Sequence, residues 1–343
     1  MPRSIPEPVF FPVNDIPVSA TSDAAGNFVF ATEPDYVSGS REYHFVKLDK
    51  GAATEVTRLD AASINNATTY SIPREVASQP AGFDLFRDAT WQDLVFDVRT
   101  PDGSLLKTVS LAIPLTGGET AQSADYKVAP GGGVAVLRYV WSGNHSYTIR
   151  YGRFDANGET VVSDVPVDPN GGYLTAWGID FAGNVLLLSR KGPPFTTVPS
   201  TARWLDPRGV PMTDWFPAGD LYIHNSFMAI PGGLGLRSEG SVLRVIADGQ
   251  ASAEPAPQWL SDRGAWWLEA IHGGSALAAR PSDDASRFRG PCGLQVEVLA
   301  ADGTSCGCVD VGVAYGIGRD GSAITSDTVA GKSVFKVYPG LFR

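Results

Sequence analysis

The sequence has no long apolar run and few charged residues. None of its apolar stretches approaches the roughly 20 residues that a helix needs to cross a bilayer, so we expect no membrane insertion. Only 19% of the 343 residues are charged, whereas Gly (38) and Pro (25) are abundant. Single cores usually stop growing at roughly 250–300 residues. A turn-rich chain of this length is therefore expected to be a ring or a repeat, or to contain several domains.

Clusters of Lys and Arg are also missing. The formal net charge is −10, and the basic residues stand apart, as in the segment RSEGSVLR (237–244). Nucleic-acid binding depends on clustered cations that displace counterions from phosphates, so we expect no nucleic-acid partner. The acidity favours solubility, with binding of a cation or a basic partner as the alternative.

The segment MPRSIPEPVFFPV at the start of the sequence lacks the apolar core and small-residue cleavage site of a secretory signal. Either the protein is cytoplasmic or a signal peptide is absent from this sequence. Lys is scarce, while Trp (8), Tyr (11) and Phe (16) are frequent, which suits an exported protein. We expect an extracytoplasmic location, secreted or at the cell surface.

The three cysteines, Cys292, Cys306 and Cys308, lie within seventeen residues. If Asp302-Gly303 forms a two-residue hairpin turn, Cys306 opposes Leu299 and Cys308 opposes Glu297. Cys292 then lies about four residue pairs from either one, roughly 13 Å, which is beyond disulfide reach. A disulfide is favoured but needs an irregular loop, and the odd count leaves one thiol over. A Cys-x-Cys zinc site is a further option, although no second ligand pair or nearby His supports it.

Helical periodicity is missing as well. No segment repeats apolar residues at the spacing i, i+3, i+4, i+7, so we expect helices only as isolated turns. What recurs instead is a turn followed by an apolar strand. It has the form Asp-x-x-Gly-Asn at residues 23–27 and 180–184, with five looser relatives. The turn glycines are Gly26, Gly82, Gly133, Gly183, Gly233, Gly274 and Gly321, spaced by about 49 residues on average. Seven such units fill the chain.

A second family of turns lies between these, as in RFDANGETVV (153–162) and VLAADGTSCGC (298–308). Each places Gly between two short runs typical of strands, which is a hairpin signature. Two hairpins in each period predict the four antiparallel strands of a propeller blade. We therefore predict an all-β fold, a seven-bladed β-propeller with four-stranded antiparallel blades, as a single domain over residues 1–343. A six-bladed ring, in which two units form one blade with a long insertion, is the alternative.

The two ends of the chain predict how the ring closes. Residues 313–338 contain three strand-like segments, one fewer than a blade requires. The short strand EPVFFPV at residues 7–13 has no hairpin partner of its own. We predict that this N-terminal strand completes the last blade.

These features resemble bacterial β-propellers with short degenerate repeats, in which Asp-x-x-Gly-Asn and an apolar strand open each blade. The resemblance covers residues 7–343, and the motif is complete only at Asp23–Asn27 and Asp180–Asn184. Blade signatures of WD and kelch repeats are missing, so the resemblance implies an architecture without a specific family or function. It also implies that ligands bind at one mouth of the central channel, where loops from every blade converge.

Residues for catalysis and metal binding are sparse. None of the four histidines lies in a Gly-x-Ser-x-Gly or His-Glu-x-x-His motif, and His44 is predicted to be structural because it alternates within a strand. An Asp-x-x-Gly-Asn turn offers two or three of the six to eight oxygens that calcium requires, and its Asp typically caps its own turn. We predict no metal, no cofactor and no catalytic residue.

Aromatic and charged residues gather just before the turn glycines, where the innermost strands and their entry loops are expected. Such a lining suits a sugar ring or a flat organic ligand. The alternative is that the aromatic residues pack between blades. The predicted ligand-binding residues are Arg74, Glu75, Tyr126, Trp177, His224, Asn225, Trp267, Glu269 and Tyr315.

These observations lead us to expect a non-catalytic binding module that presents one propeller face to a glycan or a protein partner. One alternative is a propeller hydrolase, such as a lactonase, or a lyase that acts at the channel mouth with Glu75, Glu269 or His224 as acid and base groups. A second alternative is a structural subunit of a surface assembly.

Overall fold

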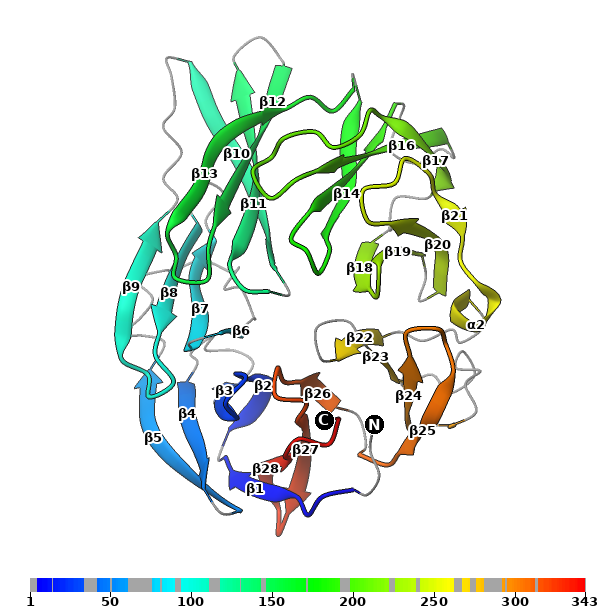
Figure 1. Cartoon of the computed structure of the whole chain (residues 1–343). Coiled ribbons are helices and arrows are strands. Elements are labelled where there is room, and N and C mark those ends of the chain that lie inside the picture. Colours follow the sequence, from blue (N-terminus) through cyan, green and yellow to red (C-terminus); the bar gives the residue numbers. More distant parts are fainter. Residues whose placement is uncertain are drawn as a thin grey trace.

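A computed structural model shows seven four-stranded antiparallel sheets arranged as the blades of a ring, and the residues that it describes contain almost no helix (Figure 1). The predicted seven-bladed propeller is therefore confirmed. The structure describes residues 5–13, 15–33, 42–49, 51–60, 76–80, 82–89, 94–110, 118–129, 131–142, 146–170, 172–191, 198–221, 226–238, 241–261, 267–271, 276–280, 292–293, 295–311 and 314–342.

Each blade starts with the strand nearest the ring axis and ends with the strand at the periphery. Blades 1 to 3 consist of β2 (Ile16–Ser22), β3 (Asn27–Glu33), β4 (Glu42–Asp49), β5 (Ala52–Asp60); β6 (Val76–Gln79), β7 (Gly82–Ala89), β8 (Leu94–Arg99), β9 (Leu105–Ser110); and β10 (Glu119–Val128), β11 (Val134–Ser142), β12 (Ser146–Phe154), β13 (Thr160–Val167). Blades 4 to 7 consist of β14 (Tyr173–Ile179), β15 (Val185–Arg190), β16 (Val198–Leu205), β17 (Phe216–Leu221); β18 (Ser226–Ile230), β19 (Gly233–Ser238), β20 (Ser241–Ala247), β21 (Glu254–Pro255); β22 (Trp267–Ile271), β23 (Ala276–Arg280), β24 (Val296–Ala300), β25 (Ser305–Val309); and β26 (Ala314–Ile317), β27 (Ala323–Val329), β28 (Lys332–Tyr338), β1 (Val9–Pro12).

The hydrophobic core is divided among the interfaces between neighbouring blades. Strand β15 shows the principle, because all six of its residues are buried. Leu187 packs with blade 3, whereas Leu186 and Leu188 pack with blade 5. Successive side chains of a strand point to opposite faces, and both faces of a blade meet a neighbour. A continuous apolar run therefore fits this fold better than an alternating one.

The turn between the first two strands of a blade, here called the a–b turn, is held by its own side chains. In blade 4, Asp180 Oδ1 accepts a hydrogen bond from the Asn184 backbone N–H (2.7 Å) and Oδ2 accepts one from Asn184 Nδ2 (2.8 Å). Gly183 has a φ of +85°, which glycine adopts without strain. Asp23 caps the equivalent turn of blade 1 in the same way. The turn-capping role predicted for this motif is confirmed.

The N-terminal strand β1 completes blade 7. It pairs antiparallel with β28, with Val9 opposite Val337, and forms the outer edge of a sheet in the order β1-β28-β27-β26 (Figure 1). Phe11 stacks on Phe30 of blade 1 (5.3 Å between ring centroids), and Phe30 stacks on Phe335 of β28 (4.4 Å). Closure therefore combines strand pairing with aromatic packing.

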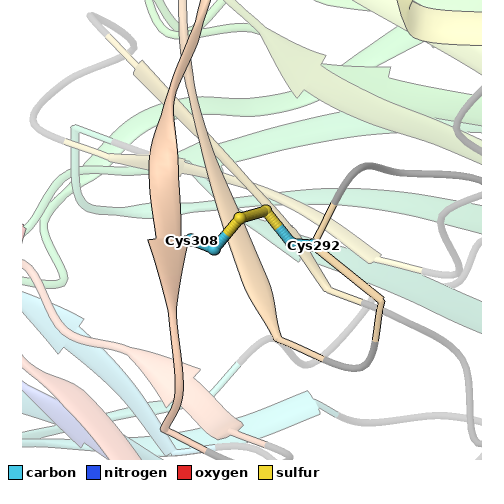
Figure 2. The surroundings of a disulfide bond; sticks show 2 residues. All are labelled: Cys292 and Cys308. Carbon is cyan, nitrogen blue, oxygen red and sulfur yellow. A yellow bond between two sulfur atoms is a disulfide. The ribbon is translucent and has the colours of Figure 1, made fainter.

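A disulfide joins Cys292 and Cys308, whose Cα atoms are 5.4 Å apart (Figure 2). Regular strands would have kept Cys292 too far from Cys308 for a disulfide. Instead the chain turns after Cys292, and in this turn the Gln295 N–H donates to the Cys292 carbonyl (3.0 Å). Cys308 opposes Glu297 as the hairpin register predicts, but a bulge displaces Cys306 from its expected position opposite Leu299. Cys306 is the free thiol, and it packs against the core between blades 6 and 7.

A single helical turn, α2 (Gln258–Ser261), inserts Leu260 into the core between blades 5 and 6. In the part of the chain that the structure describes, no helix is long and apolar enough to span a bilayer.

Candidate functional site

The innermost strands β2, β6, β10, β14, β18, β22 and β26 surround the ring axis (Figure 1). Five predicted site residues belong to these strands: Tyr126 to β10, Trp177 to β14, Trp267 and Glu269 to β22, and Tyr315 to β26. Only the side chains of Tyr126 and Trp177 are described. Arg74, Glu75, His224 and Asn225 lie outside the described residues. The nine residues therefore stay a prediction as one ligand site.

Trp177 is buried between blades 3 and 4, with 4% of its surface exposed. Tyr126 points the other way and packs against the core between blades 2 and 3. These positions correspond to the packing role that we considered as the alternative. Alternation along an innermost strand distributes side chains between two neighbouring blades, so it does not by itself select residues that face the axis.

The Trp177 side chain nevertheless organises two polar residues of β10. Its indole N–H donates a hydrogen bond to Asp125 Oδ2 (2.5 Å). Lys127 Nζ lies 5.2 Å from the centroid of its ring, within the range of a cation–π interaction. Asp125 and Lys127 are two residues apart and share the face of β10 that is turned toward blade 4. One buried aromatic side chain thus positions a carboxylate and an ammonium group from the adjacent blade.

Asp125 is the most accessible charged group in this arrangement. Its side chain is exposed although it belongs to an innermost strand. Among the described residues, only the Trp177 indole donates a hydrogen bond to its carboxylate, so Oδ1 is available to a substrate or a water. Asp125 is not among the site residues predicted from the sequence, whereas its neighbour Tyr126 is. A usable signal existed, because Asp125 and Trp177 are separated by 52 residues, about one repeat, on adjacent innermost strands.

A row of hydroxyl, imidazole and carboxylate groups occurs in blade 1. Thr32 Oγ1 lies 3.1 Å from His44 Nε2, and His44 Nδ1 lies 2.7 Å from Glu55 Oε2. Burial raises the pKa of Glu55, but hydrogen bonds from His44 and Arg58 outweigh it and hold this pKa below its ordinary value. The geometry matches that of a nucleophile, base and acid row. Thr32 is completely buried, however, so a substrate cannot reach its hydroxyl group, and the structural role expected for His44 fits.

Two further carboxyl groups lie where their charge is unfavourable. Burial raises the pKa of Asp84 to about 7, against the opposing effects of a hydrogen bond from Gln79 and the charge of Arg319. Burial and the neighbouring carboxylate of Asp180 raise the pKa of Asp248 to about 6. Within the described residues, no group of three or more His, Cys, Asp and Glu side chains is arranged to hold a metal ion.

No protein-family model and no curated protein matches the chain. Among solved structures, it is similar to an α-L-arabinanase from Penicillium chrysogenum complexed with arabinobiose, with 12% identity, a TM-score of 0.38 and coverage of 98% of both chains. It is also similar to the PQQ domain of a pyranose dehydrogenase from Coprinopsis cinerea, with 12% identity, a TM-score of 0.35 and coverage of 96% of this chain and 94% of that one.

These comparisons correct one expectation. We expected a non-catalytic binding module, but both of these solved structures are named as enzymes or enzyme domains, so the comparisons do not support that expectation. At this level of similarity, neither the arabinanase nor the dehydrogenase activity transfers to the chain. Any enzymatic role must therefore be argued from its own residues.

Proposed function

We propose that the protein is an enzyme of the hydrolase or lyase class that acts on a glycan or lactone substrate at the ring axis. The observation that carries the proposal is Asp125, an exposed carboxylate on an innermost strand that is held by the buried indole of Trp177. A carboxylate whose position is fixed by a packed neighbour is preorganised for proton transfer or for orienting a water molecule.

The surrounding charges support this role. Asp125 Oδ2 is occupied by the indole N–H, which leaves Oδ1 to accept a proton from a water or a substrate hydroxyl group. Lys127, placed over the same indole ring, brings a positive charge to the neighbourhood. Such a charge stabilises the negative charge that develops on oxygen when a lactone or glycosidic bond breaks. Asp125 would thus act as the base and Lys127 as the electrostatic stabiliser.

Glycoside hydrolysis ordinarily requires a second carboxyl group as the partner acid. Glu269 on the innermost strand β22 and the sequence-predicted Glu75 are the candidates that we carry forward. The disulfide between Cys292 and Cys308 supports an extracytoplasmic location, because disulfides persist mainly in oxidising compartments.

The test is an activity screen of the purified protein with chromogenic glycosides, polysaccharides and lactones, followed by two variants. Asp125→Asn keeps the shape of the side chain but removes its basicity, so we expect loss of turnover with unchanged folding. Asp327→Asn, at an exposed carboxylate of β27, is the matched control and should keep full activity. Equal activity of the two variants would refute the role of Asp125. Exclusive recovery of an inactive protein within a larger complex would favour a structural subunit instead.

A further inference from the structure

Arg319 reaches from blade 7 across blade 1 to blade 2. It lies in the a–b turn of blade 7, where its backbone N–H donates to the Ser22 carbonyl of blade 1 (3.1 Å). Its side-chain Nε donates to both the carbonyl oxygen and Oγ of Ser78 on β6, at 3.0 Å each. The guanidinium group is therefore fixed beside the ends of three innermost strands, β2, β6 and β26, which are neighbours around the axis (Figure 1).

This fixed guanidinium group has unused hydrogen-bonding capacity. A guanidinium carries five N–H donors, of which Nε supplies one. The described part of the chain offers no acceptor and no ion-pair partner to its two Nη groups. Arg319 is half-buried, and burial lowers its pKa although the charge of Asp84 raises it. A partly desolvated cation to which the described residues offer no ion-pair partner is unfavourable, so an anion that binds there is stabilised.

Asp84, the carboxyl group whose charge raises the pKa of Arg319, does not supply that counter-charge in acidic solution. Asp84 is 1% exposed, its Oδ2 accepts a hydrogen bond from Gln79 Nε2, and its Oδ1 has no partner. Burial raises the pKa of Asp84 to about 7, so the group stays protonated below that pH. Among the described residues, no other group compensates the positive charge of Arg319 while Asp84 is neutral, and the charge is partly balanced once Asp84 ionises.

The other described ionisable groups on the neighbouring elements are engaged elsewhere. Asp23 and Asp320, in the a–b turns of blades 1 and 7, each accept hydrogen bonds from residues of their own or the adjacent turn. On β10, which faces Asp84 from blade 3, Tyr126 packs into the apolar core. Gln79 connects Asp84 to blade 3 without adding charge, because its Oε1 accepts the Gly133 N–H (2.8 Å).

We propose that Arg319 binds a carboxylate group of a small-molecule ligand at the a–b end of the innermost strands, and that protonation of Asp84 strengthens this binding. A planar carboxylate matches the two free Nη groups in a bidentate arrangement. One cation beside a neutral acid balances a single negative charge, which favours a monocarboxylate over a phosphate dianion. The site lies apart from Asp125 in sequence and rests on its own contacts.

The test measures binding of ¹³C-labelled acetate to the full chain by NMR line broadening at pH 5.5 and pH 8.0, with chloride keeping the ionic strength constant. We expect saturable binding at pH 5.5 and about tenfold weaker binding at pH 8.0, equivalent to about 1.4 kcal/mol. Arg319→Gln should abolish saturable binding at both pH values. Arg319→Lys, which keeps the charge and is the safer variant for folding, should weaken it because the bidentate geometry is lost.

Two variants complete the design. Asp84→Asn should bind acetate equally well at both pH values, with the affinity that the wild type has at pH 5.5. Arg58→Lys changes an exposed arginine paired with Glu42 and Glu55, and it should leave binding unchanged. The proposal is overturned if the wild type shows no saturable binding, if both Arg319 variants bind like the wild type, or if Asp84→Asn keeps the pH dependence.

Discussion

Asp84 carries a carboxyl group at a position where its charge costs free energy. In the folded chain its pKa is about 7, whereas the ordinary value is 3.8. Between these values the folded chain binds more protons than the unfolded chain. The contribution of Asp84 to the free energy of unfolding therefore falls as the pH rises from about 4 to 7, and it stays low above that range.

Replacing Asp84 by Asn removes this titration. Relative to the wild type, we expect the free energy of unfolding of Asp84→Asn to increase across the same pH window, by on the order of a few kcal/mol. Urea unfolding at pH 4.5, 6.0 and 7.5 measures the difference. The exposed Asp327→Asn serves as the control. A difference between Asp84→Asn and the wild type that does not change with pH would contradict the burial of an ionisable Asp84.

The accessibility and the pKa values of single residues were the hardest properties to predict from the sequence. The aromatic content near the innermost strands could be read from the sequence, but burial decides which aromatic residue is accessible. Trp177 is buried, and its hydrogen-bond partner Asp125 is 52 residues away in the sequence, on the adjacent blade. The pKa values of Asp84 and Asp248 likewise depend on residues of other strands or blades. Such effects arise from packing that a linear pattern does not contain.

At the scale of elements, β15 tests why an unbroken apolar strand belongs in this fold. Leu187 is completely buried between blades 3 and 4, so truncation leaves a cavity. We expect Leu187→Ala to lower the free energy of unfolding by about 2–5 kcal/mol. Val161→Ala, at a half-exposed position of the peripheral strand β13, should change it by no more than about 0.5 kcal/mol. Chemical denaturation compares the two, and equal effects would contradict a core located between the blades.

The positions of strands could be predicted from the sequence where the same turn residues recur in successive blades. Six of the seven turn glycines, all except Gly274, which lies outside the described residues, occur at hairpins between the first and second strands of a blade. Register was predictable for Cys308 opposite Glu297 but not for Cys306, because a bulge inserts an extra residue there. The turn at Cys292 also escaped prediction, since hairpin arithmetic assumes regular strands.

At the scale of the whole molecule, strand β1 closes the ring without a covalent link. We propose that residues 1–343 unfold as one unit because each blade needs both neighbours to bury its faces. Deleting residues 1–15 should lower the melting temperature sharply, since it removes the pairing with β28 and the Phe11 stack. Calorimetry measures the effect, and an unchanged melting temperature would contradict closure by β1.

A milder pair of variants tests the same closure without truncation. Phe11 is buried between blades 7 and 1, whereas its neighbour Phe10 is 46% exposed. Phe11→Ala should destabilise the protein by about 3–5 kcal/mol, and Phe10→Ala should cost much less. Similar losses for the two variants would show that the seam between these blades does not hold the ring together.

Chemistry at the ring axis beside Asp125 is tested most directly by a crystal structure of the Asp125→Asn variant with a substrate that the wild type turns over. We expect the scissile bond to lie within hydrogen-bond reach of the side chain at position 125, about 2.6–3.2 Å directly or through one water. A substrate bound at the periphery of the blades, away from β10 and β14, would contradict it.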